Sequence, residues 1–280
     1  MILQEAHRMV IESIAPFYDN REASNIADIV TEHITGFGKV ERILYKKNVI
    51  DIPQEEQFRD IVIRLMKHEP IQYITGKAWF YQYIFNVNQH VLIPRPETEE
   101  LVQNIIQDNQ LNCPSIIDIG TGSGCIPISL KKNMEAEITA IDISYEALSV
   151  ATKNAKELSA SIHFKQLNFL DESNWDELSC YDIIVSNPPY IRKKEKESMY
   201  NNVLNHEPHL ALFVEDNNPL IFYEKIARFG NTHLKNQGTI WVEINEALPN
   251  ETKYVFEKEH YTTLIYNDLQ GKSRILKAWK

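Results

Sequence analysis

The stretch SIIDIGTGSGCIPISLKK, residues 115–132, decides the fold. A short apolar run leads into a turn containing Gly120, Gly122 and Gly124, and a segment with helical spacing follows. This order is typical of an open α/β sheet, in which ligands bind at the carboxyl ends of the strands. A dinucleotide-binding turn would have its third glycine at position 125, where this chain has Cys125. The pattern therefore favours close approach of a ligand to the turn at residues 120–124, with a plain strand–helix turn as the alternative.

Strand-like and helical segments alternate through the rest of the chain. Six more strands are predicted: EITAIDIS (137–144), IHFKQLNF (162–169), YDIIVSN (181–187), TIWVEI (239–244), YTTLIYND (261–268) and SRILKAW (273–279). Alternation with helices predicts a doubly wound, mostly parallel sheet. The last two strands have no helix between them and should form an antiparallel edge. The helix expected over residues 219–236 should be closed by Gly238.

Two of these strands end in residues suited to a nucleoside. Asp142 ends the second strand, where a carboxylate can accept both hydroxyls of a ribose. Its structural alternative is a helix cap before Tyr145, a role that Ser144 can already fill. Asn168 and Phe169 end the third strand, and an amide beside an aromatic ring suits an adenine. Packing of Phe169 in the core is an equal alternative.

The first third of the chain differs in character. Residues 1–70 show helical spacing, and Pro53 stands at the start of one predicted helix. Residues 79–93 are aromatic and β-branched, with Asn86 and Asn88 near the middle, which predicts a hairpin. We therefore expect a helical domain at 1–75, a β-hairpin linker at 76–95 and a Rossmann-like domain with a seven-stranded, mostly parallel sheet at 96–280.

Composition narrows the possible functions. The net charge of −10 disfavours general binding to nucleic acid, because phosphate neutralisation dominates that affinity. The three isolated cysteines suit a reducing compartment. No apolar run approaches the length of a membrane span, and the first residues do not resemble a signal peptide. His206 and His209 flank Glu207 in what the spacing favours as a polar loop, and no metal site is expected.

The fourth strand ends in Asn187-Pro188-Pro189-Tyr190. Neither proline has a backbone N–H, so this turn is suited to presenting carbonyls and side chains. With this motif in place, the chain resembles class I S-adenosylmethionine-dependent methyltransferases that act on amide or amino nitrogens. More narrowly, it is similar to the peptide chain release factor N5-glutamine methyltransferases. The similar segments are EPIQYITGKAWFY (69–81), VLIPRPETEELV (91–102), IIDIGTGSGCIPISL (116–130), AIDISYEALSVATKNA (140–155), YDIIVSNPPYI (181–191), EPHLAL (207–212) and NDLQGKSR (267–274).

The resemblance implies methyl transfer to the glutamine of a Gly-Gly-Gln motif in a release factor. The Asn187 side-chain oxygen and the Pro188 carbonyl would accept the two N–H groups of the substrate amide, and Tyr190 would pack on its plane. Asn187, Pro188 and Tyr190 are thus the expected catalytic residues, with Pro189 as a further substrate contact. The cofactor is expected to be S-adenosylmethionine, held by Gly120, Thr121, Gly122, Ser123, Gly124, Asp142, Phe169 and Asn187.

The resemblance also implies a substrate-recognition role for the helical domain, action in the cytoplasm and a monomer that binds neither membrane nor nucleic acid directly. The alternatives are an amino-methyltransferase acting on adenine N6 or guanine N2 of nucleic acid, and a cofactor-binding scaffold without catalysis. Two positions depart from the family pattern. Asn168 stands where the family has an acid, and Asn245 stands where it has a glycine.

Overall fold

A computed structural model of the chain describes residues 1–280, apart from the side chains of residues 197 and 198. The chain divides into two compact units. The smaller unit comprises Met1–Gly76 and Tyr200–His206, and the larger comprises Lys77–Met199 and Glu207–Lys280. The segment 200–206 therefore belongs with the N-terminal helices, although more than 120 residues separate them in the sequence.

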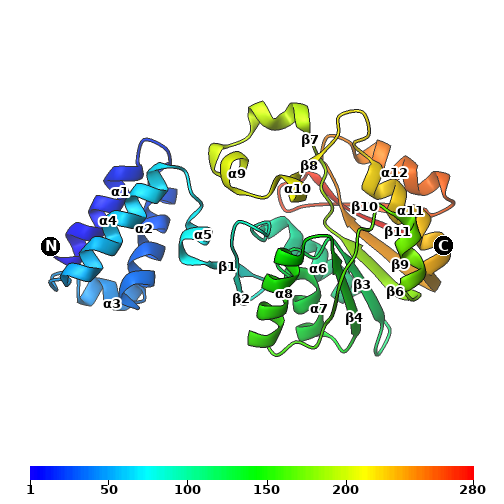
Figure 1. Cartoon of the computed structure of the whole chain (residues 1–280), viewed down its shortest axis with the longest axis horizontal. Helices are drawn as coiled ribbons and strands as arrows, with labels where there is room; N and C mark the ends of the chain where they lie inside the picture. The colour runs from blue at the N-terminus through cyan, green and yellow to red at the C-terminus, as the bar shows by residue number, and fades with distance from the viewer. The chain divides into compact units, whose positions relative to one another are not determined.

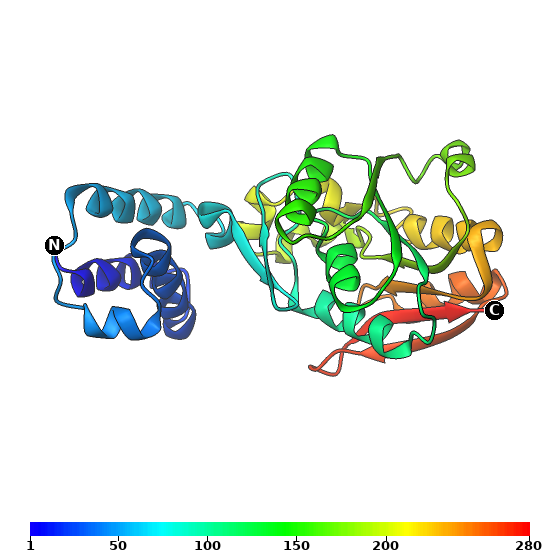
Figure 2. The same cartoon turned by 90° about the horizontal axis from the view of Figure 1, so that it is seen from below.

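The larger unit is built on a seven-stranded sheet, as the sequence predicts (Figure 1). Its strand order is β10-β11-β9-β6-β3-β4-β5. The strands are β3 (Ser115–Ile119), β4 (Glu137–Asp142), β5 (His163–Gln166), β6 (Tyr181–Ser186), β9 (Leu234–Glu243), β10 (Thr262–Asn267) and β11 (Ser273–Trp279). β11 runs antiparallel to both β10 and β9, whereas the other adjacent strands are parallel, and Figure 2 shows β11 in red beside β10. This confirms the predicted antiparallel edge.

Helices cover both faces of the sheet. The elements α6 (Pro96–Asp108), α7 (Cys125–Asn133) and α8 (Tyr145–Glu157) bury apolar residues against one face. The elements α11 (Ile221–His233), α12 (Pro249–Lys258) and the short η1 (Glu172–Glu177) cover the other. Side chains alternate between the faces, since Val185 of β6 packs on the first side and Ile184 on the second. Burial on both faces explains why these strands read as continuous apolar runs.

The larger unit also contains shorter strands and helices. They are the strands β1 (Lys77–Phe80), β2 (Tyr83–Asn86), β7 (Ile191–Arg192) and β8 (Phe213–Val214), with η2 (Lys193–Ser198) and α10 (His209–Leu212). The hairpin of β1 and β2 turns at Tyr81 and Gln82, both with positive φ, and not near Asn86 and Asn88 as predicted. Asn86 is instead buried in mutual hydrogen bonds with Asn154 of α8.

Those bonds explain why the hairpin groups with the larger unit, whereas the sequence prediction treated it as a linker. A second boundary also differs from prediction. The helix α11 ends at His233, and Leu234 already begins β9. Gly238 lies inside that strand, where a Cβ atom would come within 2.9 Å of the Asp182 carbonyl oxygen. The glycine therefore permits close strand packing and does not cap the helix.

The smaller unit is a helical bundle, and its residues 1–76 are drawn in blue to cyan in Figure 2. Its helices are α1 (Leu3–Ile14), α2 (Asn20–Thr35), α3 (Lys39–Leu44), α4 (Ile52–Met66), α5 (Ile71–Thr75) and α9 (Asn201–His206). Apolar residues of α1, α2 and α4 form its core. No helix in the described chain combines the length and apolar character that crossing a bilayer requires.

Candidate active site

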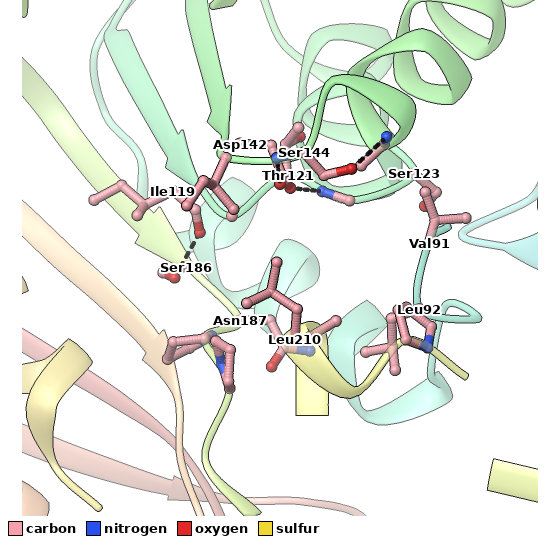
Figure 3. Close-up of a pocket in the computed structure, with 18 of the residues that line it drawn as sticks. Val91, Leu92, Ile119, Thr121, Ser123, Asp142, Ser144, Ser186, Asn187 and Leu210 are labelled. Atoms are coloured by element: carbon pink, nitrogen blue, oxygen red, sulfur yellow. Dashed lines mark hydrogen bonds between the residues drawn. The ribbon is translucent and has the colours of Figure 1, made fainter. Parts of the chain in front are cut away.

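A cavity of about 270 Å³ lies at the carboxyl ends of β3, β4, β5 and β6. Its wall comes from the residues that follow each of these strands, together with the segment between the hairpin and α6 and residues near α10. Figure 3 shows Thr121 and Asp142 on one side of the open space and Asn187 and Leu210 on the other. The position matches the general site of ligands in open α/β sheets.

The glycine turn after β3 forms part of the wall. Gly120 and Gly122 line the cavity with φ of 75° and 54°, and no other atom lies within 4 Å of where a Cβ would stand. Gly124 behaves differently, because it does not line the cavity. A Cβ there would lie 3.1 Å from the side chains of Ala151 and Ile128. Gly124 therefore permits close packing of α7 on α8, and its contact with the cofactor stays a prediction.

Asp142 fixes the turn from the neighbouring strand. Its two oxygens accept the backbone N–H of Gly122 and of Ser144, each at 2.9 Å. Burial raises the pKa of Asp142, and these two hydrogen bonds oppose the rise. The cap of α8 is Ser144, whose hydroxyl accepts the N–H of Ala147 at 3.1 Å. Asp142 is thus free of the capping role and lines the cavity.

Several polar groups beneath the turn lack partners within the described chain. The hydroxyls of Thr121 and Ser123 and both oxygens of Asp118 are buried without a partner in hydrogen-bond geometry, although Thr121 lies near enough to Asp118 to oppose the rise of its pKa. Burial raises the pKa of Asp118 to about 7. Since buried polar groups are usually satisfied, these atoms are consistent with a site that receives a polar ligand. Burial also raises the pKa of Cys125 to about 12, so its thiol is not a nucleophile at neutral pH.

The end of β5 contributes an amide and an aromatic side chain. Asn168 and Phe169 both line the cavity. The Asn168 oxygen accepts the N–H of Leu170 at 3.2 Å, which holds the loop in a turn. Phe169 is also a core residue, with its ring stacked 5.4 Å from Trp175. Phe169 is therefore both a core residue and part of the cavity wall, and its contact with an adenine stays a prediction.

The double-proline turn follows β6. Asn187, Pro188 and Pro189 line the cavity, whereas Tyr190 is not among the lining residues. The Tyr190 ring packs against the core, and its hydroxyl donates to Glu243 at 2.8 Å. Ser186 anchors the strand end by donating to the carbonyl of Ile119 at 2.7 Å, as Figure 3 shows.

Sequence reasoning missed the residues that hold this turn in place. The Asn187 amide nitrogen donates to the Thr98 hydroxyl at 3.0 Å, and Thr98 donates to Glu243 at 2.6 Å. Asn245, one of the departures from the family pattern, donates to the carbonyl of Tyr190 at 3.0 Å. The sequence places Glu243 at a strand end, but it does not show that β9 lies beside β6.

A second missed feature lies near α10. Glu207 was expected in a polar loop, but it is buried, with a relative exposure of 4%. It accepts from the Arg95 guanidinium at 2.6 Å and from the N–H of Ile93 at 3.3 Å. This pair holds the proline-rich segment 94–96 against the cavity, where Pro94 and Arg95 form part of the wall.

Two family descriptions match the chain. Residues 97–212 match a methyltransferase small domain, and residues 17–76 match a PrmC N-terminal domain. A release factor glutamine methyltransferase of Flavobacterium psychrophilum is 40% identical, with 99% of each chain covered. One of the same name from Bacteroides thetaiotaomicron is 40% identical over 95% of this chain and 96% of its own.

Solved structures support the fold of the larger unit. A Thermus thermophilus 16S rRNA N2 G1207 methyltransferase in complex with AdoMet and guanosine has a TM-score of 0.52 at 17% identity, covering 73% of this chain and 49% of that one. A Pyrococcus furiosus methyltransferase has a TM-score of 0.50 at 17% identity, covering 70% and 88%. At this identity the likeness concerns the fold alone.

Proposed function

The chain belongs to the release factor glutamine methyltransferase family, and from this we propose that it transfers a methyl group to a release factor. The donor is S-adenosylmethionine. The acceptor is the N5 side-chain nitrogen of the glutamine in the Gly-Gly-Gln motif, and the modification tunes translation termination. The match of residues 17–76 to a PrmC N-terminal domain is the observation that supports a release factor as the substrate, because the methyltransferase fold itself serves many substrates.

The cavity fits the proposed cofactor. The open backbone at Gly120 and Gly122 leaves room for close approach, and Asp142 has lone pairs remaining for ribose hydroxyls. Thr121 and Ser123 also line the cavity and would contact a polar end of the ligand. Phe169 and Asn168 would meet its adenine. When bound, S-adenosylmethionine supplies an electrophilic methyl group on a sulfonium.

The chain's own contribution is to prepare the acceptor nitrogen. The lone pair of an amide nitrogen is delocalised into its carbonyl, so the nitrogen is a poor nucleophile. The Asn187 oxygen and the Pro188 carbonyl would each accept one N–H of the glutamine and fix its direction. As the nitrogen gains positive charge its N–H groups become stronger donors, so both bonds strengthen toward the transition state. The surplus proton can then leave to water.

We propose that Tyr190 lies next to the substrate amide. Tyr190 is half-buried, and its hydroxyl donates to Glu243. A ring held in this way can present one face to a planar amide without moving. Alignment of the amide with the methyl group is a proximity effect, and it depends on how rigidly the ring is held.

We propose that the smaller unit recognises the release factor beyond its glutamine. A glutamine side chain alone offers little binding energy, so selecting one glutamine in a folded protein requires remote contacts. The bundle exposes large apolar side chains around α3, namely Val40, Ile43, Leu44, Val49 and Ile52. Exposed apolar surface of this kind commonly marks protein contacts. The proposed enzyme works as a monomer in the cytoplasm, where release factors act.

The test is methylation of a purified release factor by the purified chain with labelled S-adenosylmethionine. Label is expected on the Gly-Gly-Gln glutamine, and replacing that glutamine in the factor should abolish it. Duplex DNA and ribosomal RNA serve as parallel substrates for the alternative function. Labelling of either nucleic acid in place of the factor would reject the proposal.

A further inference from the structure

Asn187, Thr98 and Tyr190 form a hydrogen-bonded network that converges on Glu243. One carboxylate oxygen of Glu243 accepts from the Tyr190 hydroxyl at 2.8 Å, and the other accepts from the Thr98 hydroxyl at 2.6 Å. Thr98 in turn accepts from the Asn187 amide nitrogen at 3.0 Å. Thr98 and Glu243 are 2% and 1% exposed, so bulk water does not compete for these bonds.

The number of protons fixes the direction of these hydrogen bonds. Burial raises the pKa of Glu243, and the hydrogen bonds from Thr98 and Tyr190 oppose the rise by favouring the ionised form. The ionised carboxylate can only accept, so Thr98 gives its single hydroxyl hydrogen to Glu243. The Thr98 oxygen then has only lone pairs left for Asn187, and the Asn187 group that faces it must be the NH₂. The Asn187 oxygen is thereby turned away from Thr98. An isolated asparagine could present either end of its amide, since the two ends have nearly the same shape.

We infer that Glu243 and Thr98 are positioning residues that orient the Asn187 amide so that its oxygen faces the substrate, while Glu243 also holds the Tyr190 hydroxyl. This inference rests on the proposed function, because it concerns how the glutamine N–H groups are received. A flipped Asn187 would direct N–H donors at the N–H groups of the glutamine. Donors facing donors would oppose the reaction where the native arrangement assists it.

The positions of the three residues in the fold support one shared purpose. Asn187 follows β6, Glu243 ends the adjacent parallel strand β9, and Thr98 lies in the first turn of α6. Asn187 and Thr98 line the cavity, while Glu243 lies behind them. One buried carboxylate thus links both polar members of the double-proline motif to the frame of the sheet.

The test compares Thr98→Val with Thr98→Ser in release factor methylation. Valine has nearly the shape of threonine but cannot bond, whereas serine keeps the hydroxyl. Thr98→Val should lower kcat by at least about tenfold, part of the roughly hundredfold loss expected when a preorganised acceptor is removed outright. Thr98→Ser should stay within about threefold of wild type. KM for the factor and Kd for S-adenosylmethionine should change by less than about threefold in both variants.

A double mutant separates positioning from general damage. In an Asn187→Ala background, Thr98→Val should cost less than about twofold in kcat, because the amide that it orients is gone. Thr252→Val is the matched control, since Thr252 is also fully buried and donates to a backbone carbonyl at 2.8 Å, but lies in α12. Its kcat should equal that of wild type.

Glu243→Gln gives an independent readout if Thr98→Val does not fold. Glutamine has a single acceptor oxygen, so either Thr98 or Tyr190 must lose or reverse its bond. A kcat loss of at least about tenfold with Kd for the cofactor unchanged is expected. The inference would be overturned by a normal kcat in folded Thr98→Val or Glu243→Gln. It would also be overturned if Thr98→Val caused its full loss of kcat in the Asn187→Ala background. A wild-type chain that fails to methylate the factor would instead reject the proposed function.

Discussion

Replacing Asp142 with alanine should weaken binding of S-adenosylmethionine without unfolding the larger unit. The carboxylate accepts one backbone N–H on each oxygen, at 2.9 Å from Gly122 and 2.9 Å from Ser144. Each oxygen retains a lone pair for a ribose hydroxyl. Hydrogen bonds to a charged group contribute about 1.5–3 kcal/mol, which corresponds to a roughly 10- to 150-fold increase in Kd.

Isothermal titration calorimetry with S-adenosylmethionine measures this change directly. Glu137→Ala is the matched control, because Glu137 is an exposed acid at the opposite end of the same strand, β4. Its Kd should equal that of wild type. Thermal unfolding without ligand shows whether Asp142→Ala has lost more than its ligand contacts. An unchanged Kd in a folded Asp142→Ala variant would refute the ribose contact and leave Asp142 only the role of fixing the turn.

Three further predictions follow from the site and the helical bundle. Asn187→Ala should lower kcat by roughly 10²-fold while cofactor affinity stays near wild type, and turnover within a few-fold of wild type would exclude the role of its oxygen. Burial raises the pKa of Asp118 from an ordinary 3.8 to about 7, and the nearby Asp142 carboxylate adds to the rise. The folded state therefore binds the extra proton, and stability falls as pH rises from about 4 to 7. Asp118→Asn should gain stability relative to wild type between pH 5 and pH 8, up to about 4 kcal/mol in urea unfolding of the larger unit, and a difference independent of pH would contradict this. Ile43→Glu, at a side chain 62% exposed on α3, should raise KM for the intact release factor and leave KM for a short Gly-Gly-Gln peptide unchanged, whereas equal effects on both would defeat docking on the bundle.

Substitutions test the bundle more cleanly than its deletion does. Residues 200–206 belong to the same unit as Met1–Gly76, and the His206 ring contacts the carbonyl oxygen of Lys67 at 3.0 Å. Removing the first 75 residues would strip this segment of its partners. Any loss of activity could then come from the exposed segment and would not identify a docking surface.

Local patterns in the sequence were sufficient to predict the strands and the order in which strands and helices follow one another along the chain. The sequence around residues 115–132 contains a strand, a glycine turn and a helix, and the structure has all three. The cap at Ser144 was predictable because a hydroxyl just before a helix accepts a backbone N–H from a residue at most three positions later. The missing helix before the last strand was likewise enough to predict the antiparallel edge.

Contacts between residues that lie far apart along the chain could not be predicted from the sequence. Thr98 meets Glu243 across 145 positions, and Asn86 meets Asn154 across 68. The sequence does not distinguish a buried asparagine from one in a turn. The hairpin turn was therefore predicted near Asn86, whereas the chain reverses at Tyr81 and Gln82. Positive φ at two such side chains is uncommon, and residue type gives little warning of it.

The central claim is that this chain methylates the glutamine of a release factor on its side-chain nitrogen. The most direct measurement is tandem mass spectrometry of a release factor after incubation with the purified chain and S-adenosylmethionine. We expect the added mass of one methyl group on the glutamine of the Gly-Gly-Gln motif, and roughly a hundredfold slower addition with Asn187→Ala. An unmodified glutamine after prolonged incubation with the folded, cofactor-binding wild-type chain would contradict the claim.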